Sequence, residues 1–176
     1  MTPPSDVRSP QDAVYTEAVA TYGAALERLA RAYEPSPDRR PDLLQEIHVA
    51  LWRSLASFDG RCSLRTWVYR VAHNVAISEV TRRRRRTPVF VGIEELESRP
   101  DPVDHEPDLD HRRALDRILA LIHLLDPLDR QVILLYLEDL DSASIAEITG
   151  FSSGNVATKV HRIKTLLARR FREGTS

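Results

Sequence analysis

Residues 58–86 read FDGRCSLRTWVYRVAHNVAISEVTRRRRR: a short polar loop, a helical pattern and five consecutive arginines. Apolar residues recur at steps of three and four between Leu64 and Val80, which predicts a helix with one face in a core. Ser63 precedes this pattern and is expected to cap the helix. Polar side chains occupy the opposite face: Arg70, His73, Asn74, Thr81 and Arg84. Such a face suits phosphates and exposed bases, although a basic helix is often only a solvated surface.

Charge is segregated along the 176-residue chain, so the formal net charge of −1 hides two basic regions. Residues 88–111 hold eight acidic residues against one arginine, whereas residues 82–86 are all arginine. Residues 153–172 hold six Lys or Arg and no acid. Because local charge governs contact with a polyanion, we expect nucleic acid to bind at the two basic regions.

Several classes of protein are disfavoured by composition. The single cysteine, Cys62, excludes an internal disulfide framework and a multi-cysteine zinc site. No apolar run approaches membrane-spanning length, and residues 1–10 lack the apolar segment of a signal peptide, so we expect a cytoplasmic protein without membrane insertion. The acids and histidines of residues 104–111 lie in a proline-broken segment, which favours a solvated linker over a metal site. We expect no metal and no cofactor.

Two further helices are expected before this stretch. Ser9 followed by Pro10 is a typical helix start, and the apolar stripe of residues 10–33 predicts a packing helix. Residues 34–41, EPSPDRRP, predict a turn that ends it. Asp42 is expected to cap the next helix, whose buried face would consist of Leu43, Leu44, Ile47, Ala50, Leu51, Leu55 and Phe58.

A second helical domain is predicted from about Arg112. Asp126 and Pro127 are a typical N-cap and first helical residue. The helix that follows them is apolar almost all round, so we expect it to form the centre of this domain.

The spacing of Ala146, Gly150 and Val156 predicts a helix-turn-helix. The alanine lets the two helices approach, the glycine allows the tight turn, and the valine packs the second helix on the first. Ser152 is expected to cap the second helix, whose N-terminal end would enter the major groove. We assign its outward residues to base edges and phosphates: Ser153, Asn155, Thr158, Lys159, Arg162 and Lys164.

Three segments resemble the extracytoplasmic-function sigma factors of the sigma-70 family, and they occur in the family's order. Residues 42–52, DLLQEIHVALW, resemble the helix that grips the clamp helices of RNA polymerase, although His48 stands near a position that is often aromatic. Residues 63–76, SLRTWVYRVAHNVA, are similar to the promoter-melting segment. Residues 125–132, LDPLDRQV, together with the helix-turn-helix, resemble the domain that reads the −35 promoter element. Ala157 departs from the basic residue of many relatives, so the preferred promoter cannot be carried over.

The resemblance implies an all-α protein with two small helical domains. It divides the chain into a disordered N-terminus (1–9), sigma region 2 (10–86), an acidic, proline-rich flexible linker (87–111) and sigma region 4 (112–173). The function implied is that of a sigma factor, not an enzyme. The protein would bind the clamp helices and flap of core RNA polymerase, melt promoter DNA at the −10 element and read the −35 element. Family members are commonly held by an anti-sigma factor, so we expect such a partner.

The resemblance also implies the site residues of the first domain. Contacts with the −10 element are expected from Asp59, Arg61, Ser63, Arg65, Tyr69, Arg70, Asn74, Arg82, Arg83 and Arg84. Contacts with core polymerase are expected from Asp42, Gln45, Glu46 and Trp52. No residue is expected to be catalytic.

Three other classes of protein remain open from the residues alone. A polymerase-independent helix-turn-helix regulator explains the second domain but not the resemblance of residues 42–52. A module that sequesters protein partners would bind no DNA. An enzyme fits least, because no glycine-rich phosphate loop, catalytic carboxylate pair or nucleophile–base arrangement is recognisable.

Overall fold

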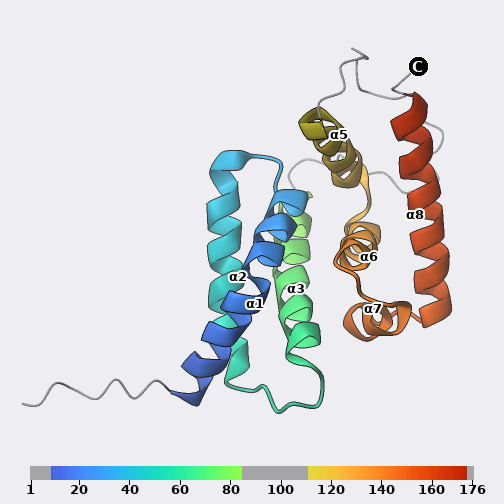
Figure 1. Cartoon of the computed structure of the whole chain (residues 1–176). Helices are drawn as coiled ribbons and strands as arrows, with labels where there is room; N and C mark the ends of the chain where they lie inside the picture. The colour runs from blue at the N-terminus through green and yellow to red at the C-terminus, as the bar shows by residue number, and fades with distance from the viewer. Residues whose placement is uncertain (1–8, 85–110, 174–176) are drawn as a thin grey trace, which may run out of the picture.

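A computed structural model describes residues 9–84 and 111–173, and every regular element in these two ranges is helical. Three helices form an N-terminal bundle: α1 (Pro10–Tyr33), α2 (Arg40–Leu55) and α3 (Leu64–Arg84). A short 3-10 helix, η1 (Pro37–Arg39), joins the first two. Four helices follow: α5 (His111–Leu124), α6 (Pro127–Leu137), α7 (Ser142–Thr149) and α8 (Ser153–Glu173). The predicted all-α fold is confirmed (Figure 1).

The apolar stripes of α1, α2 and α3 meet in one core. Leu26, Ile47, Leu51 and Val68 are each 0% exposed within it. Along α2 the buried residues are Leu43, Ile47, Leu51 and Leu55, which recur every four residues as the sequence periodicity predicts. Leu26 belongs to the buried stripe of α1, and Val68 to that of α3. The core fixes the orientation of α3, which carries the predicted promoter-melting residues.

Helix α6 lies in the middle of the C-terminal group (Figure 1). Val132 and Leu135 pack with residues of α7 and α8, while Ile133 packs with Ile163 of α8. Since α6 is buried on most of its circumference, the prediction that it forms the centre of this group is confirmed.

Local helix-start signals were predicted correctly at four positions. The side chains of Ser9, Ser63, Asp126 and Ser152 each accept a hydrogen bond from a backbone N–H of the helix that follows. At Ser9 the bond is reciprocal, because Asp12 accepts from the Ser9 backbone and closes a capping box.

Two expectations are wrong. Asp42 does not cap α2: the 3-10 turn runs directly into the helix, which begins at Arg40 and places Asp42 in its first turn. His73 does not face outward: it is 1% exposed, because α1 packs over it and the Tyr33 hydroxyl contacts its ring. The predicted linker 87–111 lies outside the described residues except for His111, as do residues 1–8 of the predicted disordered N-terminus.

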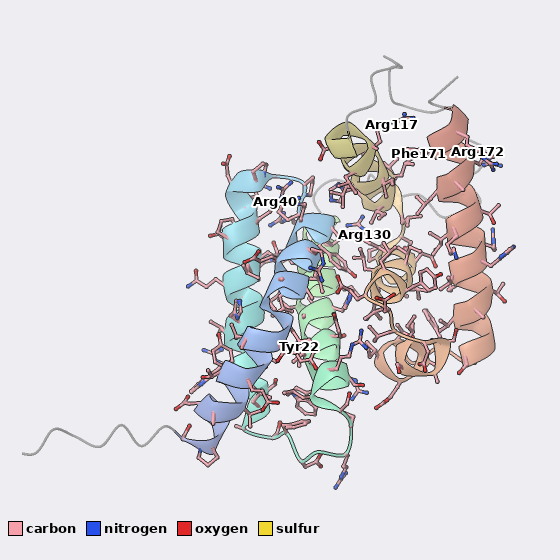
Figure 2. All side chains as sticks on the ribbon, in the orientation of Figure 1. Tyr22, Arg40, Arg117, Arg130, Phe171 and Arg172 are labelled. Atoms are coloured by element: carbon pink, nitrogen blue, oxygen red, sulfur yellow. The ribbon has the colours of Figure 1, made fainter. Side chains whose placement is uncertain are left out.

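The two helix groups pack side by side, with α3 against α6 and α7 and with α1 against α5 (Figure 1). Arg130 of α6 lies at this junction (Figure 2), where its guanidinium is 5.4 Å from the Tyr33 ring centroid and donates to the carbonyl of Leu125. Burial lowers the pKa of Arg130 to about 10, so it remains a cation at neutral pH. Among the described residues, no helix is long and apolar enough to cross a membrane.

Candidate nucleic-acid and polymerase-binding surfaces

The loop before α3 presents two predicted −10 residues to solvent. Arg61 pairs with Asp59 at 2.8 Å, and the two side chains are 89% and 50% exposed. A pair this exposed is weak, so both groups can exchange partners readily. Gly60 between them has a φ of 76°, a conformation that glycine adopts without strain.

The next predicted −10 residues lie against the second helix group. Tyr69 of α3 is 3% exposed and belongs to a cluster that contains Val132 and Leu135 of α6. The Tyr69 hydroxyl donates to a carboxylate oxygen of Glu138 at 3.2 Å. Burial first, and the adjacent Glu138 carboxylate second, raise the pKa of Tyr69 to about 12.

Glu138 is the centre of the polar contact between the two groups. Its carboxylate accepts two hydrogen bonds from the Arg28 guanidinium, each 2.7 Å long, and its backbone carbonyl accepts one from Arg65. The hydrogen bond to Glu138 raises the pKa of Arg28. Glu138 caps the C-terminus of α6, and Asp139 after it has a φ of 57°, which closes the helix.

Arg70, which follows Tyr69 on α3, contacts α7. It donates to the Glu147 carbonyl at 3.1 Å, and its guanidinium lies 3.5 Å from the Glu147 carboxylate. Asn74, one turn later, is exposed and lines an open hollow of about 370 Å³ with Glu46 and Arg82. Arg65, Tyr69 and Arg70 are therefore engaged by the second group, whereas Asn74 is accessible.

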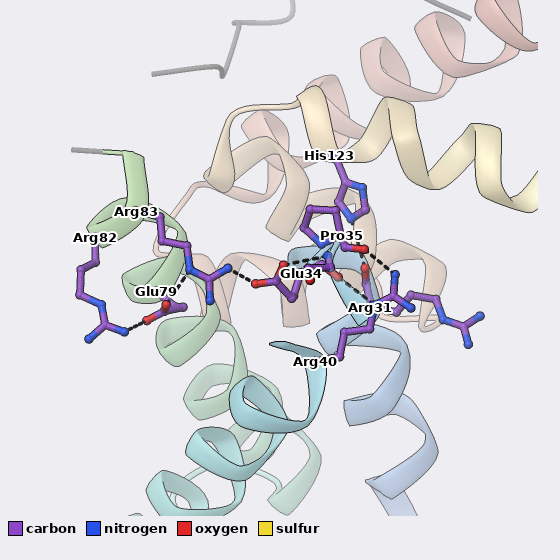
Figure 3. Close-up of polar contacts among 9 residues, drawn as sticks. Arg31, Glu34, Pro35, Arg40, Glu79, Arg82, Arg83 and His123 are labelled. Carbon is purple, nitrogen blue, oxygen red and sulfur yellow. Dashed lines mark hydrogen bonds and ion pairs between the residues drawn. The ribbon is translucent and has the colours of Figure 1, made fainter. Parts of the chain in front are cut away.

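Arginines at the basic end of α3 form ion pairs with glutamates of the N-terminal bundle (Figure 3). Arg83 pairs with Glu79 at 2.8 Å and with Glu34, a carboxylate whose side chain is only 3% exposed. Arg82 also pairs with Glu79, but it is 68% exposed. The side chain of Arg84 lies outside the described part of the chain.

Gly150 forms the turn of the predicted helix-turn-helix. Its φ is 79°, and its N–H donates to the Ala146 carbonyl at 2.9 Å to end α7. Val156 is 0% exposed and packs α8 onto α6 and α7. The local geometry expected of a helix-turn-helix is present.

The predicted −35 residues differ in what they contact. Ser153, Asn155 and Thr158 are exposed on α8. Lys159 turns back instead: its ammonium pairs with Asp129 at 2.5 Å and lies 5.4 Å from the Phe151 ring centroid. Lys164 donates to the Tyr136 hydroxyl at 2.8 Å. Arg162 is half-buried and already has an interaction within the chain.

The predicted polymerase-binding residues lie on the outer side of α2. Asp42, Gln45 and Glu46 line an open hollow of about 470 Å³, together with Val49. Trp52 is 43% exposed, and its indole N–H donates to Asp12 at 2.9 Å, so it also fastens the start of α1.

Sequence reasoning missed the acids that face the basic residues. Glu138 contacts residues that lie 69 to 110 positions away, so no local pattern announces it. It also missed His161, which is exposed on α8 and which helical phase identifies as an outward position. Among the described residues, no group of three or more His, Cys, Asp or Glu is arranged to hold a metal ion.

Comparison with protein families matches both helix groups. Residues 18–86 match the family model of sigma-70 region 2, and residues 115–167 match that of sigma-70 region 4. The chain is 30% identical to the ECF RNA polymerase sigma-E factor of Haemophilus influenzae, over 72% of this chain and 71% of that protein. It is 32% identical to the RNA polymerase sigma factor YlaC of Bacillus subtilis, over 70% and 72% of the two chains.

Two solved structures share the fold. The sigma factor RpoE of Bartonella quintana, in complex with the anti-sigma factor NepR, has a TM-score of 0.68 at 18% identity, over 90% of this chain and 96% of that one. CnrH, in complex with the cytosolic domain of CnrY, has a TM-score of 0.63 at 22% identity, over 88% and 85%.

Proposed function

The chain belongs to the extracytoplasmic-function sigma factors of the sigma-70 family and directs promoter-specific transcription, and we propose how its surfaces divide that work. The observation that carries the proposal is the presence of both sigma regions, in order, on one chain whose α2, α3 and α8 each present a separate polar surface.

The N-terminal bundle would hold the −10 element. Arg61 and Asn74 are accessible on either side of Arg65, Tyr69 and Arg70, which the second helix group covers. Once uncovered, these three residues would supply cations and an aromatic ring for stacking. Extruding a base from the duplex costs a few kcal/mol, which stacking and hydrogen bonds in such a site offset. Arg82 would contact the DNA backbone, a role independent of sequence.

The C-terminal group would read the −35 element through α8. The N-terminal end of this helix is capped by Ser152 and is followed by the exposed residues Ser153, Asn155 and Thr158. The exposed start of a recognition helix is the part that reaches base edges in the major groove. Lys164 at the edge of the same face suits a phosphate.

Core polymerase would bind α2 through Asp42, Gln45, Glu46 and the exposed part of Trp52. The protein would act without catalysing a reaction itself, and it would work in the cytoplasm, where core polymerase and promoter DNA are. The two structural neighbours were solved with anti-sigma factors, which supports a partner of that class for this chain as well.

Run-off transcription tests the proposal. Purified core polymerase is combined with the full chain on a genomic promoter library, and template-specific initiation is expected only when the chain is present. Replacing Asn74 and Arg70 by alanine is expected to abolish initiation while binding to core polymerase persists.

The alternative class of protein gives a different result in the same assay. If the chain binds duplex DNA but neither binds core polymerase nor supports initiation, the assignment of Asp42, Gln45, Glu46 and Trp52 is wrong. A polymerase-independent helix-turn-helix regulator would then be the better account.

A further inference from the structure

The buried and outward faces of α8 define which side chains meet DNA. Val156, Val160 and Ile163 are buried on one side. Since successive residues rotate by about 100° around the helix axis, the line directly opposite contains Gly154, Thr158, His161 and Thr165. All four are exposed.

His161 is the residue on this line that has both reach and free hydrogen-bonding capacity. The Thr158 hydroxyl already donates to the Gly154 carbonyl at 3.0 Å. A neutral imidazole has one N–H donor and one acceptor nitrogen, and both lie at the end of a side chain that faces solvent. Lys159, the stronger donor nearby, is held by Asp129 on the other side of the helix.

The neighbours of His161 favour close approach to a groove. Gly154 and Ala157 precede it on the exposed face and carry little or no side chain, so the helix can sit deep while the imidazole projects further. His161 is the ninth residue of α8, about 12 Å along the axis at 1.5 Å per residue. It therefore lies just over two turns from the N-terminal end of α8, the end that reaches base edges in a helix-turn-helix.

From these observations we propose that His161 is a specificity-determining residue of the −35 contact and that it donates to guanine. Guanine presents two acceptors, N7 and O6, in the major groove, so it offers the ring N–H more partners than any other base. This inference rests on the proposed −35 role of α8.

The test compares His161→Ala with the unchanged protein in run-off transcription on promoters with a randomised −35 element. The unchanged protein is expected to select guanine at one position, and the variant to lose that preference by roughly tenfold while other positions keep theirs. Lys164→Ala is the comparison, because loss of a phosphate contact lowers transcription from all sequences alike.

The outcomes separate this inference from the proposed function. Failure of the unchanged protein to initiate at any promoter contradicts the proposed function. If it initiates and His161→Ala keeps the same base preferences, or loses activity equally on all sequences, His161 does not read a base and the inference is overturned.

Discussion

The hydroxyl oxygen of Tyr33 in α1 lies 2.9 Å from Nδ1 of His73 in α3, and the two side chains are 2% and 1% exposed. Their rings meet edge to face, with centroids 5.6 Å apart. Burial lowers the pKa of His73 to about 3 and raises the pKa of Tyr33, so both groups are neutral at physiological pH. This neutral pair joins two helices of the N-terminal bundle directly beneath Arg130 of the second domain.

Stability should fall with acid because of this histidine. An unfolded chain binds a proton at His73 near its ordinary pKa of about 6.5, whereas the folded chain binds one only near pH 3. Between these values the unfolded state holds the extra proton, so the free energy of unfolding decreases as pH falls, by at most about 1.4 kcal/mol per pH unit from this group. Urea unfolding at pH 7, 6 and 5 measures the slope.

His73→Phe provides the comparison. The variant is expected to be less stable at pH 7, because the Tyr33 hydroxyl loses its partner, but to show a shallower slope. Burial also lowers the pKa of His48 and His123, so some slope should remain. If the free energy of unfolding falls with pH equally steeply in the two proteins, the pKa of His73 in the folded state is not lowered.

Gly150 should tolerate no other residue without loss of stability. Its φ of 79° costs an L-residue about 1–2 kcal/mol, so Gly150→Ala should lower the free energy of unfolding by about that amount. Gly154→Ala is the control, since Gly154 lies in α8 and a Cβ there meets no atom within 4 Å. Because alanine favours a helix by up to about 1 kcal/mol, the control should be neutral or more stable. Equal losses at both positions would contradict the turn geometry.

Substitutions of Leu51 and Val49, two nearby residues of α2, should affect stability and polymerase binding separately. Leu51 is 0% exposed, so Leu51→Ala should cost about 2–5 kcal/mol of stability. Val49 is 41% exposed and lines the hollow with Asp42 and Glu46, so Val49→Ala should cost less than about 1 kcal/mol but weaken binding to core polymerase. Thermal unfolding and a core-polymerase pull-down measure the two effects. Unchanged polymerase binding in folded Val49→Ala would exclude this face of α2.

Lys159 should act on folding more than on promoter choice. Its ammonium neutralises Asp129, which is only 7% exposed, so Lys159→Ala leaves a largely buried carboxylate without its cation. A loss of about 1–3 kcal/mol is expected, and Asp129→Asn should recover part of it in the double variant. Chemical unfolding of the four proteins in this cycle measures the coupling. If the losses of stability from the two substitutions are simply additive, the Lys159 side chain is not coupled to Asp129 and remains available for the DNA contact that its sequence position predicts.

Local signals explain what was predictable from the sequence. Ser9, Asp126 and Ser152 act on backbone groups within three residues, so their cap roles can be read without tertiary information. Asp42 failed as a cap because a 3-10 turn three residues long shifts the helix start, which the proline-rich turn does not reveal.

Tertiary contacts explain what was not predictable. The helical wheel places His73 beside Arg70, yet α1 covers the histidine and α7 meets the arginine. One helix face can therefore be divided between burial in its own bundle and contact with a second domain. Glu138 could not be assigned at all, because its partners are remote in sequence and its own surroundings resemble an ordinary polar helix end.

Arg82 and Arg83 are adjacent in sequence, but their substitution should affect different properties: promoter binding for Arg82 and stability for Arg83. Arg83 neutralises Glu34, whose side chain is 3% exposed, so Arg83→Ala leaves that carboxylate without its cation and should lower stability by about 1–3 kcal/mol (Figure 3). Arg82 is 68% exposed, so Arg82→Ala should leave stability within about 0.5 kcal/mol. Its loss should instead appear as a salt dependence of promoter binding by the holoenzyme that is shallower by about one unit of slope. Thermal unfolding and binding at several salt concentrations measure both properties in both variants. The reverse result, with Arg83→Ala stable and Arg82→Ala unstable, would mean that the second arginine of the run, and not the first, faces the DNA.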